Sequence, residues 1–316
     1  MYTISKKKIK GKYYDYANYS FRLPNKKIKK ISKYIKDINN YNKKEIETYF
    51  FEKEIEQSQK YALEKYKPNS ILTNDKINKI EKTKIEYKHL IKKLSKKQFK
   101  DILNRFTINF TYESNAIEGN SLTLKDVTLM LMENISPKNK ELREIYETRN
   151  TREANTLLFD KKLKLNIENI IKFHSLLIKD TDVNPGFKKI PNYLLMRDVE
   201  TTPPELVKNE IIKLVEWYNL NIDSKHLFEI VSEFHARFEK IHPFEDGNGR
   251  IGRFLINAIL MNKGYPPIII RKTVRTSYFA ALEAFDKGFK NKLHRFILEK
   301  YFETFKKFFK VYVKYI

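Results

Sequence analysis

The sequence is organised around one stretch, Ile241-His242-Pro243-Phe244-Glu245-Asp246-Gly247-Asn248-Gly249-Arg250-Ile251-Gly252-Arg253. It combines an imidazole, two carboxylates, a glycine-rich turn and two guanidinium groups. An amphipathic helical pattern runs from about Lys225 to Lys240 before the turn, and a second runs from Asn248 to Lys263 after it. The stretch therefore predicts two helices joined by a short loop that carries most of the chemistry.

The turn has the composition of an anion-binding site. Gly247 and Gly249 let backbone N–H groups approach an anion closely, and a helix that starts there adds the positive end of its dipole. Arg250 and Arg253 are three residues apart, so they share one helix face. Two bidentate guanidinium groups on one face suit neighbouring phosphates. This part of the stretch predicts a site for a polyphosphate.

Two further side chains add reactive groups to the same loop. Asp246 is a natural ligand for Mg²⁺, which proteins hold through one or two carboxylates together with substrate phosphates. His242 can accept a proton from an attacking hydroxyl. The alternative interpretation is an ordinary helix–loop–helix with solvated charges. The concentration of all these groups in one loop favours a nucleotide site.

The glycine spacing also matches a dinucleotide-binding fingerprint, through Gly247, Gly249 and Gly252. That fingerprint requires a buried strand before it and an acidic residue about twenty positions later. Here an amphipathic helix precedes the glycines, and Pro-Pro-Ile-Ile-Ile-Arg-Lys occupies 266–272. A dinucleotide-binding fold is therefore excluded by context. The chain also lacks Gly-Lys-Ser/Thr, which excludes a P-loop.

Composition narrows the class of protein. The 316 residues carry 63 Lys and Arg against 39 Asp and Glu, a formal net charge of +24, and no cysteine. Zero cysteines exclude disulfides and thiolate metal sites. The charge suggests nucleic acid as one partner. However, the lysines are spread along predicted helices, and the codon bias of an AT-rich genome explains their abundance equally well. Nucleic acid is therefore not the favoured partner. No apolar run of membrane length or signal peptide is present, so a cytoplasmic location is expected, with export as an effector also open.

The remaining pattern predicts an all-α fold with two small β elements. Aromatic residues over 12–34 predict a hairpin around Pro24-Asn25, and helices follow from about Asn42. Ser95 and Thr123 open capped helices, Ser136-Pro137 opens one that runs to about Phe159, and Thr202-Pro203-Pro204 opens another. We expect an N-terminal extension over 1–95 and a catalytic domain over 96–316.

The central stretch resembles the signature of the Fic family, His-Pro-Phe-x-Asp/Glu-Gly-Asn-Gly-Arg-x-x-Arg. Each specified position is filled, by His242, Pro243, Phe244, Asp246, Gly247, Asn248, Gly249, Arg250 and Arg253. The resemblance extends over roughly 100–305. It implies a Fic-type helical bundle with a short β-hairpin flap. It also implies transfer of AMP from ATP to a Ser, Thr or Tyr hydroxyl of another protein, with release of pyrophosphate.

The resemblance also implies roles for individual residues. His242 is then the general base and Asp246 the Mg²⁺ ligand. Asn248 and the amides of Gly247 and Gly249 hold the α-phosphate, Arg250 binds the phosphates, and Arg253 binds the γ-phosphate. Asn257, about one helical turn after the motif, is a further candidate for contacting the base or ribose, with helix packing as the alternative. His174 and His235 are predicted to be hydrogen-bonded core residues.

An upstream segment resembles the inhibitory motif of the same family, Ser/Thr-x-x-x-Glu-Gly/Asn. It is Ser114-Asn-Ala-Ile-Glu118-Gly119, and the helix that carries it is expected at about 108–119. In this interpretation Glu118 forms a salt bridge with Arg253 and prevents productive binding of the γ-phosphate. The alternative is a surface glutamate at a helix end.

The expected flap lies at Phe187–Arg197. Pro185-Gly186-Phe187-Lys188-Lys189 resembles the family's Gly-x-x-Arg flap, with Gly186 at the turn and Lys189 where arginine is usual. Lysine keeps the charge but loses the planar fork of arginine. A flap edge suits a target segment that binds by strand addition, and an ordinary loop is the alternative.

Several alternatives stay open at the level of sequence. The same site could run in reverse and remove AMP from a modified protein, or could use another donor such as UTP. A non-enzymatic alternative is a basic nucleic-acid-binding regulator. The partner expected first is a target protein with an acceptor hydroxyl, and self-modification and a homodimer are secondary expectations. No membrane partner is expected.

Overall fold

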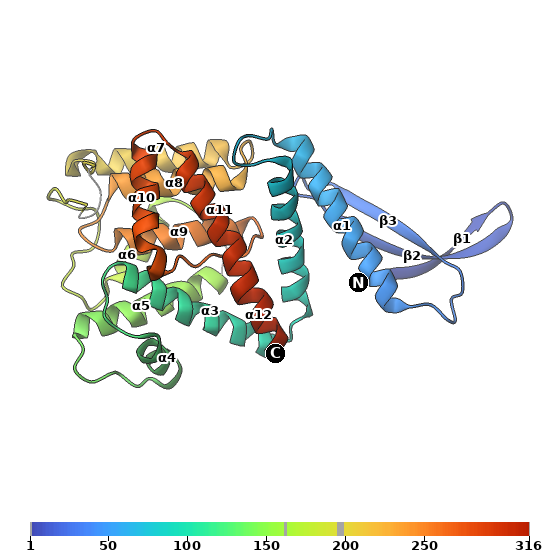
Figure 1. The fold of residues 1–316 in the computed structure, drawn as a ribbon, viewed down its shortest axis with the longest axis horizontal. Coiled ribbons are helices and arrows are strands. Elements are labelled where there is room, and N and C mark those ends of the chain that lie inside the picture. Colours follow the sequence, from blue (N-terminus) through green and yellow to red (C-terminus); the bar gives the residue numbers. More distant parts are fainter. Residues whose placement is uncertain (1, 161–162, 195–198, 316) are drawn as a thin grey trace. The chain divides into compact units, whose positions relative to one another are not determined.

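The computed structural model describes residues 2–160, 163–194 and 199–315, and it divides into two compact units, Met1–Glu86 and Tyr87–Ile316. The first unit contains a three-stranded antiparallel sheet in the order β1-β2-β3, followed by helix α1 and most of α2 (Figure 1). The second unit is helical. The expected all-α fold with a small N-terminal β element is confirmed.

The strands are β1 (Thr3–Ile9), β2 (Lys12–Arg22) and β3 (Ile28–Ile35). The predicted hairpin over 12–34 corresponds to β2 and β3, and β1 is an additional strand that pairs along β2. Ala17 and Ile35 of the sheet pack on Ile46 and Phe50 of α1. The sheet thus uses one face to form the small core of the first unit.

The helices are α1 (Lys43–Lys65), α2 (Asn74–Lys93), α3 (Lys96–Ile117), α4 (Leu124–Glu133), α5 (Leu142–Asp160), α6 (Ile167–Leu177), α7 (Pro204–Asn221), α8 (Leu227–Ile241), α9 (Asn248–Asn262), α10 (Arg275–Asp286), α11 (Asn291–Thr304) and α12 (Lys310–Tyr312). A π-helical turn over Phe305–Phe309 joins the last two. The predicted capping boxes at Ser95 and Thr123 are both present at the starts of α3 and α4.

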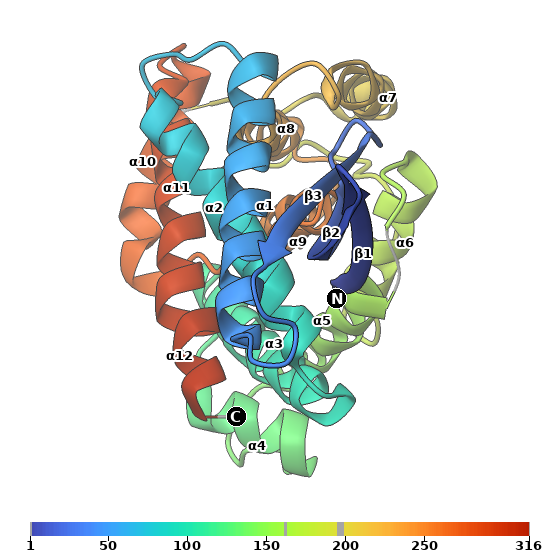
Figure 2. The same ribbon diagram turned by 90° about the vertical axis from the view of Figure 1, so that its right-hand side faces the viewer.

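Helix α9 is the centre of the helical unit. It packs against α3, α6 and α8, and Figure 2 shows it in the interior of this unit. Its side chains are buried almost along its whole length. A helix that is apolar nearly all round is stable only inside a domain. Its N-terminus is consequently held rigidly at the point where the central loop enters.

One helix begins later than predicted. Ser136-Pro137 was expected to open the helix that ends near Phe159, but α5 starts at Leu142. Asn139 has φ 58°, a left-handed conformation that does not continue a right-handed helix. The residues after Pro137 therefore form a turn, and the helix starts once that turn has ended. Among the described residues, no helix combines the length and apolar character needed to span a bilayer.

Candidate active site

The loop between α8 and α9 is shaped by two left-handed residues. His242 ends α8 at φ 48°, and Gly247 precedes α9 at φ 81°. Asn248 connects the two ends of the turn. Its side-chain oxygen accepts from the backbone N–H of Phe244 at 2.9 Å, and its amide donates to the carbonyl of Phe244 at 2.8 Å. The Asn248 side chain therefore fixes the loop, and the expected contact of Asn248 with the α-phosphate stays a prediction.

His242 is held in one orientation. Its backbone N–H donates to the carbonyl of Phe238 at 3.0 Å, and its Nδ1 lies 3.3 Å from the carbonyl oxygen of Glu239. A carbonyl only accepts hydrogen bonds, so Nδ1 carries the proton in this contact. In the neutral ring the acceptor lone pair is then on Nε2. This is the tautomer that a general base requires.

His174 of α6 packs against the loop and bonds to it. Its ring stacks on Phe244, with centroids 3.8 Å apart and planes 3° apart, and its Nε2 lies 3.1 Å from the carbonyl oxygen of Asp246. The side chain is fully buried. The prediction of a hydrogen-bonded core histidine is confirmed, and the bond positions the predicted metal ligand. Burial lowers the pKa of His174 to about 4.

The depressed pKa predicts a loss of stability in acid. Between pH 6.5 and pH 4 the unfolded chain binds a proton at His174 that the folded chain does not bind, so the free energy of unfolding falls as the pH falls through this window. His174→Phe keeps a ring against Phe244 but cannot titrate. From pH 7 to pH 5, wild type should lose about 2 kcal/mol more than this variant in urea unfolding, at up to about 1.4 kcal/mol per pH unit. Equal losses in the two proteins would contradict this role for His174.

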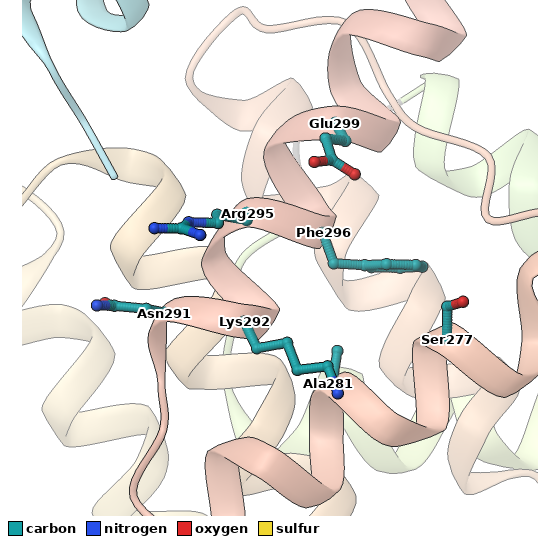
Figure 3. Close-up of a pocket in the computed structure, with 7 residues that line it drawn as sticks. All are labelled: Ser277, Ala281, Asn291, Lys292, Arg295, Phe296 and Glu299. Atoms are coloured by element: carbon teal, nitrogen blue, oxygen red, sulfur yellow. The ribbon is translucent and has the colours of Figure 1, made fainter. Parts of the chain in front are cut away.

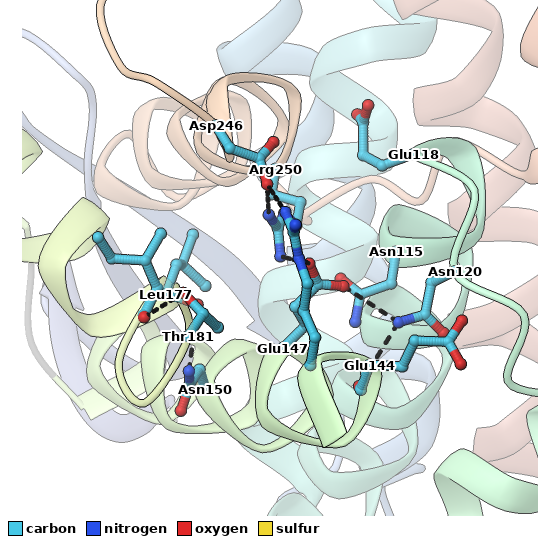
Figure 4. Close-up of polar contacts among 12 residues, drawn as sticks. Asn115, Glu118, Asn120, Glu144, Glu147, Asn150, Leu177, Thr181, Asp246 and Arg250 are labelled. Carbon is cyan, nitrogen blue, oxygen red and sulfur yellow. Dashed lines mark hydrogen bonds and ion pairs between the residues drawn. The ribbon is translucent and has the colours of Figure 1, made fainter. Parts of the chain in front are cut away.

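A charge network surrounds Asp246. Arg250 is almost fully buried and lies between two carboxylates, with Nη2 3.1 Å from Asp246 Oδ2 and Nη1 3.1 Å from Glu147 Oε1 (Figure 4). Arg143 of α5 contacts the same Asp246 oxygen and also pairs with Glu147 at 3.3 Å. Burial raises the pKa of Asp246, but the nearby Arg250, the Gly247 N–H and Arg143 outweigh it, so the pKa lies below its usual value. Asp246 is therefore ionised at neutral pH.

Arg143, Glu147 and His174 are site residues that the sequence motif did not reveal. They come from α5 and α6, and Arg143 is 103 positions away from its partner Asp246. Only the packing of these helices brings the side chains together. The one local signal was the apolar face of α6, which predicted that His174 is buried and therefore hydrogen-bonded.

The predicted inhibitory contact is present. Arg253 Nη2 lies 2.7 Å from Glu118 Oε1 at the C-terminus of α3. Ser114 holds the same guanidinium, because its hydroxyl accepts from Nε at 3.0 Å and its carbonyl from Nη2 at 2.8 Å. Arg253 is 2% exposed and the Glu118 side chain 37% exposed. The arginine is thus fixed by the fold, whereas the glutamate reaches it from a more open position.

Gly249 lies directly against the Glu118 carboxylate. A Cβ added at Gly249 would stand 2.1 Å from Glu118 Oε1, far closer than atoms approach, and 3.1 Å from Arg253 Nη1. The carboxylate therefore occupies the space above the backbone at the start of α9. That space is where a helix N-terminus binds an anion. The Glu118 carboxylate, an anion of the chain itself, thus occupies the predicted anion-binding site.

This contact predicts a strong coupling between positions 118 and 249. Gly249→Ala should destabilise wild type by about 1–2 kcal/mol because the methyl group displaces Glu118. In a Glu118→Gly background the same change should be neutral or stabilising, since alanine is favoured over glycine in helices by about 0.5–1 kcal/mol. Urea unfolding of the four proteins measures the coupling. A Gly249→Ala effect that is the same in both backgrounds would mean that Glu118 does not occupy this space.

The flap segment pairs with the central loop. Gly186 has φ 89°, Phe187 forms an isolated antiparallel bridge with Phe244, and the backbone N–H of Lys188 donates to the carbonyl of Pro243 at 2.9 Å. The expected hairpin partner, up to Arg197, lies partly outside the described residues. Lys189 is exposed. The flap edge is therefore anchored beside the loop that carries His242.

The buried side chain of Lys188 holds the same segment in place through hydrogen bonds. Its Nζ donates to Asn192 Oδ1 at 2.6 Å and to Thr201 Oγ1 at 3.0 Å, and Asn192 in turn donates to the carbonyl of Phe244 at 2.8 Å. Burial lowers the pKa of Lys188 to about 8. The sequence pointed to Lys189 as the flap cation, but its neighbour makes the structural contacts.

Asn257, a candidate for contacting the base or ribose, makes both of its side-chain hydrogen bonds to the backbone of one residue. Its amide donates to the carbonyl of Ile268 at 3.0 Å, its oxygen accepts from the N–H of Ile268 at 2.7 Å, and it is fully buried. Both polar ends of the side chain bond within the fold, which supports the helix-packing alternative.

A separate pocket of about 360 Å³ between α10 and α11 is lined by none of the predicted site residues (Figure 3). Among the described residues, no three acidic or histidine side chains gather as a metal cage.

Comparisons with known proteins point to one family. Residues 164–260 match the model of the Fic/DOC family. Protein adenylyltransferase Fic of Nematostella vectensis is 31% identical over 183 residues, which cover 56% of this chain and 43% of that protein. Protein adenylyltransferase fic-1 of Caenorhabditis elegans is 29% identical over 188 residues, covering 57% and 36%. The matches thus span less than half of these relatives.

Solved structures show the same fold. A Fic domain containing signaling protein from Bacteroides thetaiotaomicron has a TM-score of 0.67 and 25% identity, with 74% of this chain and 96% of that chain covered. Fic-1 of C. elegans has a TM-score of 0.67 at 22% identity, with 75% and 72% covered. The central loop lies inside the region that the family model matches.

Proposed function

Residues 164–260 form a domain of the Fic/DOC family, and from this premise we propose that the protein transfers AMP from ATP to a Ser, Thr or Tyr hydroxyl of a target protein. We further propose that Glu118 inhibits this transfer by binding Arg253. The observation that carries the proposal is the Glu118 carboxylate at the start of α9, 2.7 Å from Arg253 and against Gly249. A cradle that holds one anion of the chain suits the phosphates of a nucleotide once that anion leaves.

The reaction needs a base, a held phosphate chain and a leaving group. His242 Nε2 accepts the proton of the acceptor hydroxyl, and the hydroxyl oxygen then attacks the α-phosphorus of ATP. The bond from this phosphorus to the pyrophosphate oxygen breaks, and pyrophosphate leaves with the electron pair. Little covalent work is left to the protein, so positioning and neutralisation of charge dominate the rate.

Three groups neutralise the phosphates. The backbone N–H groups at Gly247 and Gly249, at the positive end of α9, face the α-phosphate in this proposal. Arg250 is already fixed by Glu147, so it contributes charge without a large loss of side-chain freedom. Arg253 is fixed by Ser114 and receives the γ-phosphate in place of Glu118.

The residues around Asp246 fit a magnesium ion. The carboxylate is ionised and partly exposed, and both of its arginine contacts use the single oxygen Oδ2. Bound there, Mg²⁺ would supply positive charge to the departing pyrophosphate. Arg143 has two further carboxylates within reach, Glu147 at 3.3 Å and the exposed Asp182 at 3.6 Å. It can therefore move from Asp246 without losing every ionic partner.

The flap offers an edge to which an extended segment of the target protein can bind. The bridge between Phe187 and Phe244 keeps the flap beside His242, and flap residues such as Lys189 are exposed. An extended acceptor segment that adds to this edge through main-chain bonds would bring its hydroxyl towards the base. The same surface can take a segment of this chain, which gives self-modification.

The reverse reaction is the second candidate function. Glu118 is 37% exposed and lies beside the predicted α-phosphate position. A carboxylate there can orient a water molecule towards an AMP-modified hydroxyl, with His242 returning the proton to the leaving oxygen. The choice of nucleotide donor is a separate question. The Asn257 side chain is already bonded to Ile268, so among the described residues no contact is assigned to the nucleotide base. UTP is therefore a further donor to compare with ATP.

The position of the labelled phosphate in ATP distinguishes AMP transfer from phosphoryl transfer. With the Glu118→Gly variant and Mg²⁺, label from α-labelled ATP should become covalently attached to protein, and label from γ-labelled ATP should not. Asp246→Ala in the same background should abolish the labelling and its dependence on Mg²⁺. Labelling from the γ position would instead indicate a kinase, and Asp246→Ala activity that still follows the magnesium concentration would exclude Asp246 as the ligand. Release of AMP from a modified target tests the reverse reaction.

A further inference from the structure

The N-terminal sheet has two faces of different character. Residues that stand opposite each other on paired strands point to the same side, and successive residues alternate between sides. Tyr16 stands opposite Ser5 and Tyr34, while its neighbour Ala17 stands opposite Ile4 and Lys33. The face of Ala17 packs on α1. The face of Tyr16 is turned away from α1 and forms no part of this core.

The face turned away from α1 is basic and aromatic, and we call it the tyrosine face. By the strand pairing it consists of Thr3, Ser5, Lys7, Ile9, Lys12, Tyr14, Tyr16, Asn18, Ser20, Arg22, Ile28, Lys30, Ser32 and Tyr34. It holds no acidic residue. The one acidic residue among the first 36 positions, which contain 12 Lys and Arg, is Asp15 on the opposite face.

Three tyrosines form a cluster at the centre of this face. The ring of Tyr34 lies 5.9 Å from that of Tyr14 and 5.7 Å from that of Tyr16, and Lys7 lies 6.0 Å from the Tyr16 ring. Tyr34 is 49% exposed. Asn18 bonds to Ser5 and Ser32 on either side, which orders the polar row next to the rings. The rings are therefore fixed on a rigid sheet and still open to a ligand.

We propose that the tyrosine face binds single-stranded nucleic acid. Flat aromatic rings on a sheet stack on unpaired bases, and surrounding cations neutralise the phosphate backbone. Lysine on the edge strand β1 also serves to prevent aggregation between sheets. That explanation does not account for cations on the central strand, such as Lys12 and Arg22, or for the tyrosine cluster. The opposite face also carries lysines, Lys6, Lys8, Lys29 and Lys33, so the tyrosine cluster and the absence of acidic residues distinguish the tyrosine face.

The inference does not rest on AMP transfer, and a binding measurement on the full chain tests it. Fluorescein-labelled fifteen-residue oligo(dT) and oligo(U) would be titrated with wild type at several salt concentrations. Tyr16→Ala/Tyr34→Ala should weaken binding by about tenfold or more, with an unchanged dependence on salt, because stacking and not charge is removed. Lys7→Ala should instead reduce the salt dependence.

Neighbouring residues on the opposite face provide the controls. Tyr13→Ala and Lys8→Ala remove the same side chains from the same strands, and Tyr13 is more exposed than Tyr34, yet both variants should bind within about twofold of wild type. Tyr16→Phe/Tyr34→Phe keeps the rings and should also bind normally, which separates stacking from misfolding. Binding that resists the tyrosine-to-alanine change, or that is equally tight for heparin or anionic vesicles, would overturn the proposal in favour of a general polyanion surface.

Discussion

Replacing His242 with alanine or asparagine is expected to reduce AMP transfer by about 10²–10⁴-fold, the usual contribution of a general base. The Glu239 carbonyl holds the proton on Nδ1 and so leaves the accepting lone pair on Nε2. The asparagine variant is the sharper one, because asparagine tolerates the left-handed backbone that His242 adopts at φ 48°. Initial rates of labelled-AMP transfer in the Glu118→Gly background give the size of the effect.

ATP affinity is the control for this variant. His242 belongs to the chemistry and not to the phosphate contacts in the proposed mechanism, so the dissociation constant for ATP should change by less than about threefold while the rate falls. A loss of affinity that accounts for the whole rate defect would place His242 among the binding residues. Retention of the wild-type rate would remove it from the mechanism.

Replacing Glu118 with glycine is expected to raise both ATP binding and transfer by about tenfold or more. The variant removes the charged partner of Arg253 and empties the space above Gly249. Charged hydrogen bonds contribute roughly 1.5–3 kcal/mol, and the partial exposure of Glu118 argues for the lower end. Isothermal titration with ATP measures the first effect, and labelled transfer measures the second.

Two control variants separate the inhibitory contact from a general loosening of the helices. Glu133→Gly makes the same change at an exposed helix end, in the last turn of α4, and should leave ATP binding as it is. Arg253→Ala in addition to Glu118→Gly should remove the gain, because the arginine is the group that Glu118 withholds from the phosphate. An increase of similar size in the Glu133 variant would show that the gain has nothing to do with the site.

Much of the local structure was predictable because its causes are local. The capping boxes at Ser95 and Thr123 and the turn with left-handed Gly247 follow from residue types at short spacings. His235 is likewise a core histidine as predicted, 1% exposed and bonded to the hydroxyl of Tyr278 at 2.7 Å. The apolar period of α8 was enough to place it inside.

The parts that escaped prediction depend on packing between distant segments. Asn248 could hold phosphate or hold the loop, and only the folded turn shows its two bonds to Phe244. Arg143 and Glu147 reach the site because α5 lies beside it, and no spacing in the sequence encodes that proximity. The tyrosine face depends in the same way on the register of three strands.

Labelled-AMP incorporation by Glu118→Gly, compared with wild type and with Glu118→Gly/His242→Ala, tests the central claim most directly. A complete active site that Glu118 holds inactive predicts weak labelling of wild type, an increase of about tenfold or more in the single variant, and loss of that increase in the double variant. Equal labelling of wild type and the Glu118 variant, at an ATP concentration well below saturation, would contradict it.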